Sequence, residues 1–573
     1  MTTRRAGHRR QVGAVALLAV VALLVTSPLA RAEGDPATPK AMCGPGALPE
    51  TDIQGRVPTA DYESGRTKQG YLCNTEQISH EGASGGFRVY RYIDASGHEC
   101  GYYDTTLLIG VSLLLGPNAG VAVLDMSDPS HPVRTATLIT PAMLSPHESL
   151  NLNQRRGLLA AVMGSPGTAP GIVDIYDLSV DCRFPQLRST GVAALAGHEA
   201  TFSPDGNTFY VTATALPYLT ALDVTDPTTP TPVWTSTDHL VHGMNVSDDG
   251  NRLYTADLGA SRGLTILDVT QVQQRVPNPQ VPVISHLTWS NVSVPQTNLP
   301  ITIAGRPYVV EIDEYAGAAS ADPAAPVGAG RIIDIADEAN PAVVSNLRLE
   351  VNDPISRAGP QKSDPGADSP AQGYAGHYCA VPQRDDPGIV ACSFIVSGLR
   401  IFDIRDPARP SEIAYFNPPS RDFGASPAAA APATATESSA GLSGLYSCRL
   451  AVANATAPAA DPPIGTGDLL GNIPGLPASG STLSHYAMSA PTFVPERKEV
   501  WYSDGLYGFY ALRLTNGVWE PVASAPAEQA ELAAPAPVGE TLPATGRATP
   551  LFFVLAALVV AAAATRAARS TRP

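Results

Sequence analysis

The feature that most constrains this chain is a short hydrophobic pattern that recurs along it and ends in an Asp-Pro turn. Residues 219–230 read LTALDVTDPTTP, and related segments begin near residues 121, 172, 264, 331, 399 and 509. A hydrophobic run that stops at Asp-Pro predicts the end of a β-strand, because proline has no N–H to donate to a sheet. The seventh segment, FYALRLTNGVW, lacks the aspartate but keeps the hydrophobic spacing. The recurrence predicts one structural unit repeated seven times.

The residues around each repeated segment predict the rest of the unit. One or two strand-like runs precede the segment, and a short extended segment follows most copies. A unit of about four short strands cannot bury both of its faces alone, so neighbouring units must stack. We therefore expect an all-β fold, a seven-bladed β-propeller of four-stranded antiparallel blades, over residues 100–519. A β-helix and two β-sandwiches are alternatives, but the strand spacing is too long for the first and the repetition does not suit the second.

Three other regions of the chain are predicted to lie outside the blades. Residues 33–99 are Gly-rich and polar and are expected to form an irregular N-terminal segment packed on the propeller. Residues 417–483 are rich in Ala, Pro, Gly and Ser and are predicted to be a low-complexity insertion. Residues 520–541 are rich in Pro and Ala, which is typical of an extended spacer.

The repeated segment resembles the LVIVD-repeat family of bacterial β-propellers. The residues that carry the resemblance are those around Asp125, Asp223, Asp268, Asp334 and Asp403. The family is defined by its repeat more than by a chemistry. The resemblance therefore implies a fold more strongly than it implies a function.

The first 32 residues are typical of a secretory signal peptide. Arginines at positions 4, 5, 9 and 10 precede an apolar run at residues 14–26, and Ala30, Arg31 and Ala32 form a small-residue cleavage site. Such a segment is removed on export, here after Ala32. The arginine pair leaves general secretion and twin-arginine export both open.

The C-terminal residues 542–573 resemble the LPxTG cell-wall sorting signal of Gram-positive surface proteins. The pentapeptide is followed by an apolar run at residues 551–564 and then by a basic tail; its members are Leu542, Pro543, Ala544, Thr545 and Gly546. The resemblance implies cleavage by a sortase after Thr545 and covalent attachment to peptidoglycan, with the apolar run acting as a transient transmembrane helix. A plain C-terminal membrane anchor is the alternative. Only four of the 37 basic residues are lysine, which suggests a GC-rich genome.

The charge of the chain restricts the classes of partner that we expect, and its cysteine content bears on the cellular compartment. The net charge is −16 and the mature part has no basic run, which argues against nucleic acid and anionic lipid as partners. Seven cysteines in an exported chain are candidates for disulfide bonds. Cys379 and Cys392 flank a turn almost symmetrically and are predicted to pair across a hairpin. The partners of the other five cysteines cannot be deduced from spacing.

Histidines recur at one position of the repeat and are the candidate metal ligands. Each of these histidines lies 12 or 13 residues before a fixed position in the middle strand of its unit. The pairs are His147 and Leu159, His198 and Tyr210, His242 and Tyr254, and His377 and Val390. That position is expected at the mouth of the central channel, so imidazoles from different blades would converge there. Imidazole suits Zn, Cu, Fe and Ni. The alternative is that each histidine packs one blade against the next.

Neighbouring positions refine the metal hypothesis. Glu148 and Glu199 directly follow two of these histidines and would orient them. The fifth unit has Gln296 or Thr297 in place of histidine, and His98 and His485 fit the spacing less well.

We identify no catalytic residue from the sequence, because nucleophile elbows, phosphate loops and His-Glu-x-x-His motifs are absent. Two functions remain. The first, which the sequence favours, is a wall-displayed binding module for an unknown extracellular ligand. The second is an extracellular metal-dependent oxidase or hydrolase that uses the histidine site.

Overall fold

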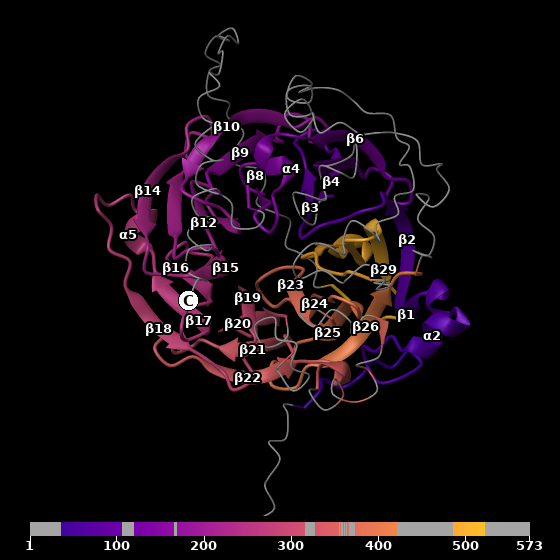
Figure 1. Cartoon of the computed structure of the whole chain (residues 1–573). Helices are drawn as coiled ribbons and strands as arrows, with labels where there is room; N and C mark the ends of the chain where they lie inside the picture. The colour runs from indigo at the N-terminus through magenta and orange to yellow at the C-terminus, as the bar shows by residue number, and fades with distance from the viewer. Residues whose placement is uncertain are drawn as a thin grey trace, which may run out of the picture.

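The computed structural model describes residues 36–105, 120–164, 169–315, 327–353, 373–420 and 485–521, together with residues 356, 359, 361, 364 and 365. These residues form seven antiparallel sheets that follow one another around a ring (Figure 1). The predicted seven-bladed all-β propeller is confirmed. In each sheet, strands adjacent in sequence are hydrogen-bonded neighbours.

The first four blades each have four strands, given from the centre of the ring outwards. Blade one contains β3 (Val89–Ile93), β4 (Glu99–Asp104), β5 (Val121–Asp125) and β6 (Val133–Leu138). Blade two contains β7 (Asn151–Asn153), β8 (Leu158–Val162), β9 (Gly171–Asp177) and β10 (Gln186–Ala194). Blade three contains β11 (Ala200–Phe202), β12 (Thr208–Thr212), β13 (Leu219–Asp223) and β14 (Thr231–Ser236). Blade four contains β15 (Val241–Val246), β16 (Arg252–Asp257), β17 (Gly263–Asp268) and β18 (Val283–Leu287).

The last three blades include two strands from the N-terminal part of the chain. Blade five contains β19 (Val294–Ile303), β20 (Arg306–Glu314), β21 (Gly330–Asp334) and β22 (Ala342–Leu347). Blade six contains β23 (Gly376–Ala380), β24 (Ile389–Phe394), β25 (Gly398–Asp403) and β26 (Ser411–Asn417), with β1 (Tyr71–Cys73) as a fifth, outermost strand. Blade seven contains β27 (Thr492–Val494), β28 (Glu499–Asp504), β29 (Gly508–Leu514) and, outermost, β2 (Thr75–Glu81).

Short helices connect or flank the strands. They are α2 (Thr59–Ser64), η1 (Arg66–Gln69), α4 (Pro141–Leu144), α5 (Thr270–Gln273), η2 (Glu350–Asn352) and η6 (Pro495–Arg497). In the part of the chain that the structure describes, no helix is long and apolar enough to span a membrane. The predicted signal peptide, LPATG segment and apolar run 551–564 lie outside the described residues, as do Cys448 and most of the insertion predicted at 417–483.

The repeated aspartates hold the turn after the third strand in six of the seven blades. The carboxylates of Asp125, Asp223 and Asp334 each accept a hydrogen bond of 2.9 Å from the backbone N–H two residues on. Asp177, Asp268 and Asp403 do the same. An aspartate that bonds its own turn in this way ends the strand and starts the outward connection. The seven recurring segments of the sequence are therefore the third strands of the seven blades.

The ring is closed by β2, and this corrects the boundary predicted at residue 100. Strand β2 pairs with β29, so the N-terminal strand completes the blade formed by the C-terminal strands (Figure 1). Strand β3, which opens blade one, also lies before residue 100. The sequence of β2 is polar and half exposed, which hides its strand character. Residues 33–99 are thus only partly irregular.

Three disulfide bonds stabilise this arrangement. Cys379 and Cys392 pair across the β23–β24 hairpin, which confirms the prediction. The other two bonds join Cys43 to Cys73 and Cys100 to Cys182.

The inner strands run in the same direction, which gives the ring two distinct faces. The first strands of neighbouring blades contact one another, as β7 contacts β11 and β15 contacts β19. We call the face at which these inner strands begin the histidine face, because His147, His198, His242 and His377 lie at or just before those strand starts.

Candidate metal centre

The four predicted histidines converge on one carboxylate at the histidine face. The Nε2 atoms of His198, His242 and His377 lie 3.1, 3.3 and 3.4 Å from the oxygens of Glu148. The Nε2 atom of His147 lies 3.7 Å from the same group. These residues come from blades two, three, four and six. Residues up to 230 positions apart in sequence are thus brought together by the ring (His147 to His377, 377 − 147).

Backbone and threonine contacts fix three of the imidazole rings. Nδ1 of His242 donates to the carbonyl of Pro295 at 3.0 Å, and Nδ1 of His377 donates to the carbonyl of Met488 at 2.8 Å. Nδ1 of His198 lies 3.3 Å from the hydroxyl of Thr214. A ring held through Nδ1 presents Nε2 to the centre, as metal-binding histidines usually do.

The backbone of His147 is in the left-handed region, with φ of 49°. This conformation is uncommon for a residue with a side chain, and such residues gather at functional sites.

Two glutamates supply the carboxylates of the cluster. Glu148 lies among the imidazoles, whereas the sequence assigned it only the orienting of a ring. Glu314, at the end of β20, lies 3.6 Å from Nε2 of His242 and 3.4 Å from Nε2 of His377. Glu314 was not predicted from the sequence, because it lies at the end of a second strand, whereas the histidines lie at or just before a first strand. Blade five therefore contributes a carboxylate, whereas blades two, three, four and six contribute imidazoles.

A second layer of polar residues lies behind the cluster. Arg88 donates to the carboxylate of Glu199 at 2.8 Å and to the backbone carbonyl of Glu148 at 3.0 Å. The hydroxyl of Tyr378 donates to Glu199 at 2.9 Å and accepts from Gln296 at 2.8 Å. The guanidinium of Arg88 also stacks 4.1 Å from the centre of the Tyr378 ring. Glu199 is thus held by Arg88 and Tyr378, and it is not one of the central carboxylates.

The cluster is buried and contains polar atoms without hydrogen-bond partners. Glu148 is 2% exposed and His377 is fully buried. Within the described residues, Oε2 of Glu148 and Nε2 of His198 and of His377 have no hydrogen-bond partner, nor does Nδ1 of His147. Buried polar atoms nearly always have a partner, because leaving one unpaired costs about 1–3 kcal/mol. A bound cation would satisfy the two Nε2 atoms and Oε2 of Glu148, so the residues present fit a metal ion.

Mutual electrostatics shift the pKa values of the cluster in opposite directions. Burial and the neighbouring imidazoles lower the pKa of His147 to about 3. Burial also lowers the pKa of His242 and of His377, but Glu148 and Glu314 outweigh it and raise each to about 9. Burial raises the pKa of Glu148, but the surrounding histidines bring it well below its ordinary value.

The remaining candidate positions lie outside the cluster. His98 is in the β3–β4 turn at the opposite face, where Asp94 accepts its Nδ1 hydrogen bond at 2.8 Å. Asp94 also accepts hydrogen bonds from three backbone N–H groups, so its oxygens are already satisfied. His485 is buried, and its Nε2 lies 2.7 Å from the carbonyl of Pro418.

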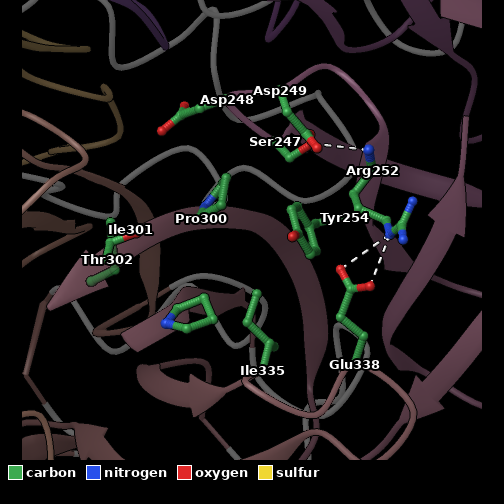
Figure 2. A pocket seen from close by; sticks show the side chains of 11 residues that line it. Ser247, Asp248, Asp249, Arg252, Tyr254, Pro300, Ile301, Thr302, Ile335 and Glu338 are labelled. Carbon is green, nitrogen blue, oxygen red and sulfur yellow. Dashed lines mark hydrogen bonds and ion pairs between the residues drawn. The ribbon is translucent and has the colours of Figure 1, made fainter. Parts of the chain in front are cut away.

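A cleft of about 410 Å³ lies at the opposite face, between blades four and five (Figure 2). Its charged groups pair with nearby side chains. Arg252 lies 2.9 Å from Glu338, and Asp248 lies 2.8 Å from Arg384 outside the cleft. Because these charges are already paired, we place the candidate functional site at the histidine cluster.

One protein-family model matches part of the repeat. The LVIVD repeat family model matches residues 117–140, which include β5 and β6. No curated protein matches the chain.

Similar solved structures have low sequence identity. The β-propeller domain of Cps50 (Swd1) from Myceliophteria thermophila is 11% identical with a TM-score of 0.43, and the match covers 77% of this chain and 100% of that one. Hydrazine synthase from Kuenenia stuttgartiensis is 12% identical with a TM-score of 0.42, covering 76% and 97%. The periplasmic gluconolactonase PpgL from Pseudomonas aeruginosa is 15% identical with a TM-score of 0.29, covering 53% and 93%. These similarities carry no functional argument. The chain is a seven-bladed β-propeller that carries an LVIVD repeat.

Proposed function

We propose that this protein is an exported, wall-displayed β-propeller that binds a transition-metal ion at its histidine face. The observation that carries the proposal is the convergence of three imidazole Nε2 atoms on the buried carboxylate of Glu148. Two of those nitrogens, and one oxygen of Glu148, have no hydrogen-bond partner within the described residues.

The spacing of the ligand atoms supports a metal over simple packing. Two atoms that each lie about 2.1 Å from one ion are roughly 3.0–3.4 Å apart at octahedral to tetrahedral angles. The distances from Glu148 to His198, His242 and His377 span 3.1–3.4 Å. Imidazole together with carboxylate is a donor set suited to Zn, Fe or Mn. A bound ion would supply Lewis-acid or redox chemistry, and the chain would hold it in a buried site.

Metal analysis of the purified protein tests the proposal. The wild type should contain Zn, Fe, Mn or Cu in stoichiometric amount, and His198→Ala should lose at least about tenfold in affinity, because one ligand is gone. His485→Ala is the matched control, since it removes a buried histidine outside the cluster. A folded wild type that binds no metal, or a His198→Ala variant that binds as well as His485→Ala, would refute the metal site.

Wall display is supported by the sequence of residues 542–573 and by the disulfide bonds. Three disulfides among the described residues are consistent with an extracellular protein. The LPATG segment is the proposed sortase substrate, with peptidoglycan as the attachment partner. Thr545→Ala should release the protein from the wall fraction into the membrane fraction or medium. Ala548→Ser, just outside the pentapeptide, is the control, and equal wall retention of the two variants would contradict sortase anchoring.

A further inference from the structure

We propose that the histidine face holds two metal ions bridged by Glu148 and Glu314. The inference rests on the proposed metal site and adds its nuclearity, its bridging groups and the assignment of each histidine to one ion.

The two oxygens of Glu148 face different pairs of histidines. Oε2 lies 3.1 Å from Nε2 of His198 and 3.3 Å from Nε2 of His242. Oε1 lies 3.4 Å from Nε2 of His377 and 3.7 Å from Nε2 of His147. A single ion bound by all four imidazoles would have to lie where this carboxylate now lies. Two ions, one on each side, leave Glu148 in place as a bridge.

Glu314, which comes from a different blade, also has its two oxygens near different histidines. Its Oε1 lies 3.6 Å from Nε2 of His242, and its Oε2 lies 3.4 Å from Nε2 of His377. Each glutamate therefore has one oxygen on the His242 side and one on the His377 side. A carboxylate shared in this manner spans two ions about 3.5–4 Å apart, as in two-metal sites.

The oxygens of Glu148, and not ring packing, place His147 with His377, because the ring of His147 also lies 4.6 Å from that of His198. The ring of Phe87 lies 4.4 Å from the ring of His147 and 5.4 Å from that of His377, measured between centroids. The rings of His198 and His242 lie 5.0 Å apart. One ion would thus take His198 and His242, and the other would take His147 and His377.

The number of donors is sufficient for two ions. Four imidazoles and two carboxylates face one buried space, which exceeds the four donors of one tetrahedral site and equals the six of one octahedral site. With two ions, each has two imidazoles and one oxygen from each bridging carboxylate, and each can still take a water molecule.

Counting ions separates this inference from the proposed function. The purified full-length protein is stripped with a chelator and dialysed against Zn²⁺ alone, and bound zinc is measured per chain. Two zinc ions per chain support the bridged pair. One zinc ion overturns the pair but leaves the proposed metal site, and no bound zinc overturns both. His98→Ala, which removes the separate Asp94–His98–Asp181 group, should bind the same number as the wild type.

Manganese provides a measurement of proximity. Two Mn²⁺ ions bridged by carboxylates are magnetically coupled, so the electron paramagnetic resonance spectrum of the loaded protein should lack the six-line signal of an isolated ion. An isolated six-line spectrum at full loading would overturn the pair.

Variants test the assignment of the ligands. The double variant His147→Ala/His377→Ala should bind one zinc ion instead of two, and binding of two would show that the pairing is wrong. If that variant does not fold, Glu314→Gln replaces it, because the amide keeps the shape of the side chain but is a poor bridge. Glu314→Gln should weaken one zinc ion at least about tenfold, and two unchanged affinities would exclude Glu314 as a bridge.

Discussion

Single residues at one repeated position have separate roles in this ring. Glu148 and Glu199 both follow a histidine, and their backbones form a bridge between blades two and three. Glu148 faces the imidazoles, whereas Glu199 is held by Arg88 and Tyr378. The repeat aligns the two glutamates in sequence, but partners from other blades decide what each carboxylate does.

Gly243, which follows His242, allows Glu199 to reach this position. A Cβ atom at residue 243 would overlap with the Glu199 carboxylate and with the backbone carbonyl of Gln296. We predict that Gly243→Ala lowers the free energy of unfolding by about 1–3 kcal/mol, the usual cost of overpacking. Urea denaturation measures it. Gly191→Ala is the control, because a Cβ there meets nothing within 4 Å. Equal free energies of unfolding for the two variants would show that Glu199 moves aside without a loss of stability.

At the scale of the element, the repeated aspartate at the end of a third strand can both bond its own turn and form an ion pair. In blade three, Asp223 accepts from the N–H of Thr225 and lies 3.1 Å from the guanidinium of Arg275, which follows α5. Burial raises the pKa of Asp223, but the hydrogen bonds from Arg275 and Thr225 lower it to about 2.

This lowered pKa predicts a pH-dependent stability. A carboxyl whose pKa falls on folding stabilises the fold above its unfolded value of about 3.9 and stops doing so as the pH drops through the folded value. The stability difference between wild type and Asp223→Asn should therefore be full above about pH 5 and vanish near pH 2. Unfolding by urea at several pH values measures it. Asp238→Asn, at an exposed loop position, is the control, and a pH-independent difference for Asp223→Asn would contradict the role of its charge.

At the scale of the whole molecule, the N-terminal segment is part of the propeller. Strand β2 closes the ring and β1 covers the edge of blade six, which leaves that edge unavailable for pairing with other chains. Arg400 of β25, which is fully buried, pairs with Glu412 and also with Glu50 of the N-terminal segment.

The ion pair with Glu50 predicts that docking of this segment is required for stability. Glu50→Ala should lower the free energy of unfolding by at least about 1.5 kcal/mol, because it leaves a buried guanidinium short of one charged partner. It should also speed proteolysis near residue 50. Urea denaturation and timed proteolysis measure both effects. Glu63→Ala, on the exposed side of α2, is the control; if both variants match the wild type, the segment is not held by this contact.

Much of the architecture could be predicted from the sequence, because the determinants are local. A hydrophobic run ended by Asp-Pro specifies a strand and a turn without help from distant residues, and seven such units leave few ways to bury their faces. The Cys379–Cys392 pair is also local, across one hairpin. Strand β2 was missed because its polar residues do not distinguish an exposed outer strand from a loop.

The sequence determined the repeat, its turns and the recurring histidines, while only the tertiary structure decided what those histidines contact. Spacing placed His147, His198, His242 and His377 near a common channel but did not separate metal ligands from packing residues. The central place of Glu148 and the contribution of Glu314 follow from closing the ring, which brings side chains from blades two to six into one buried space. That convergence depends on angles between blades, and no short stretch of sequence encodes them.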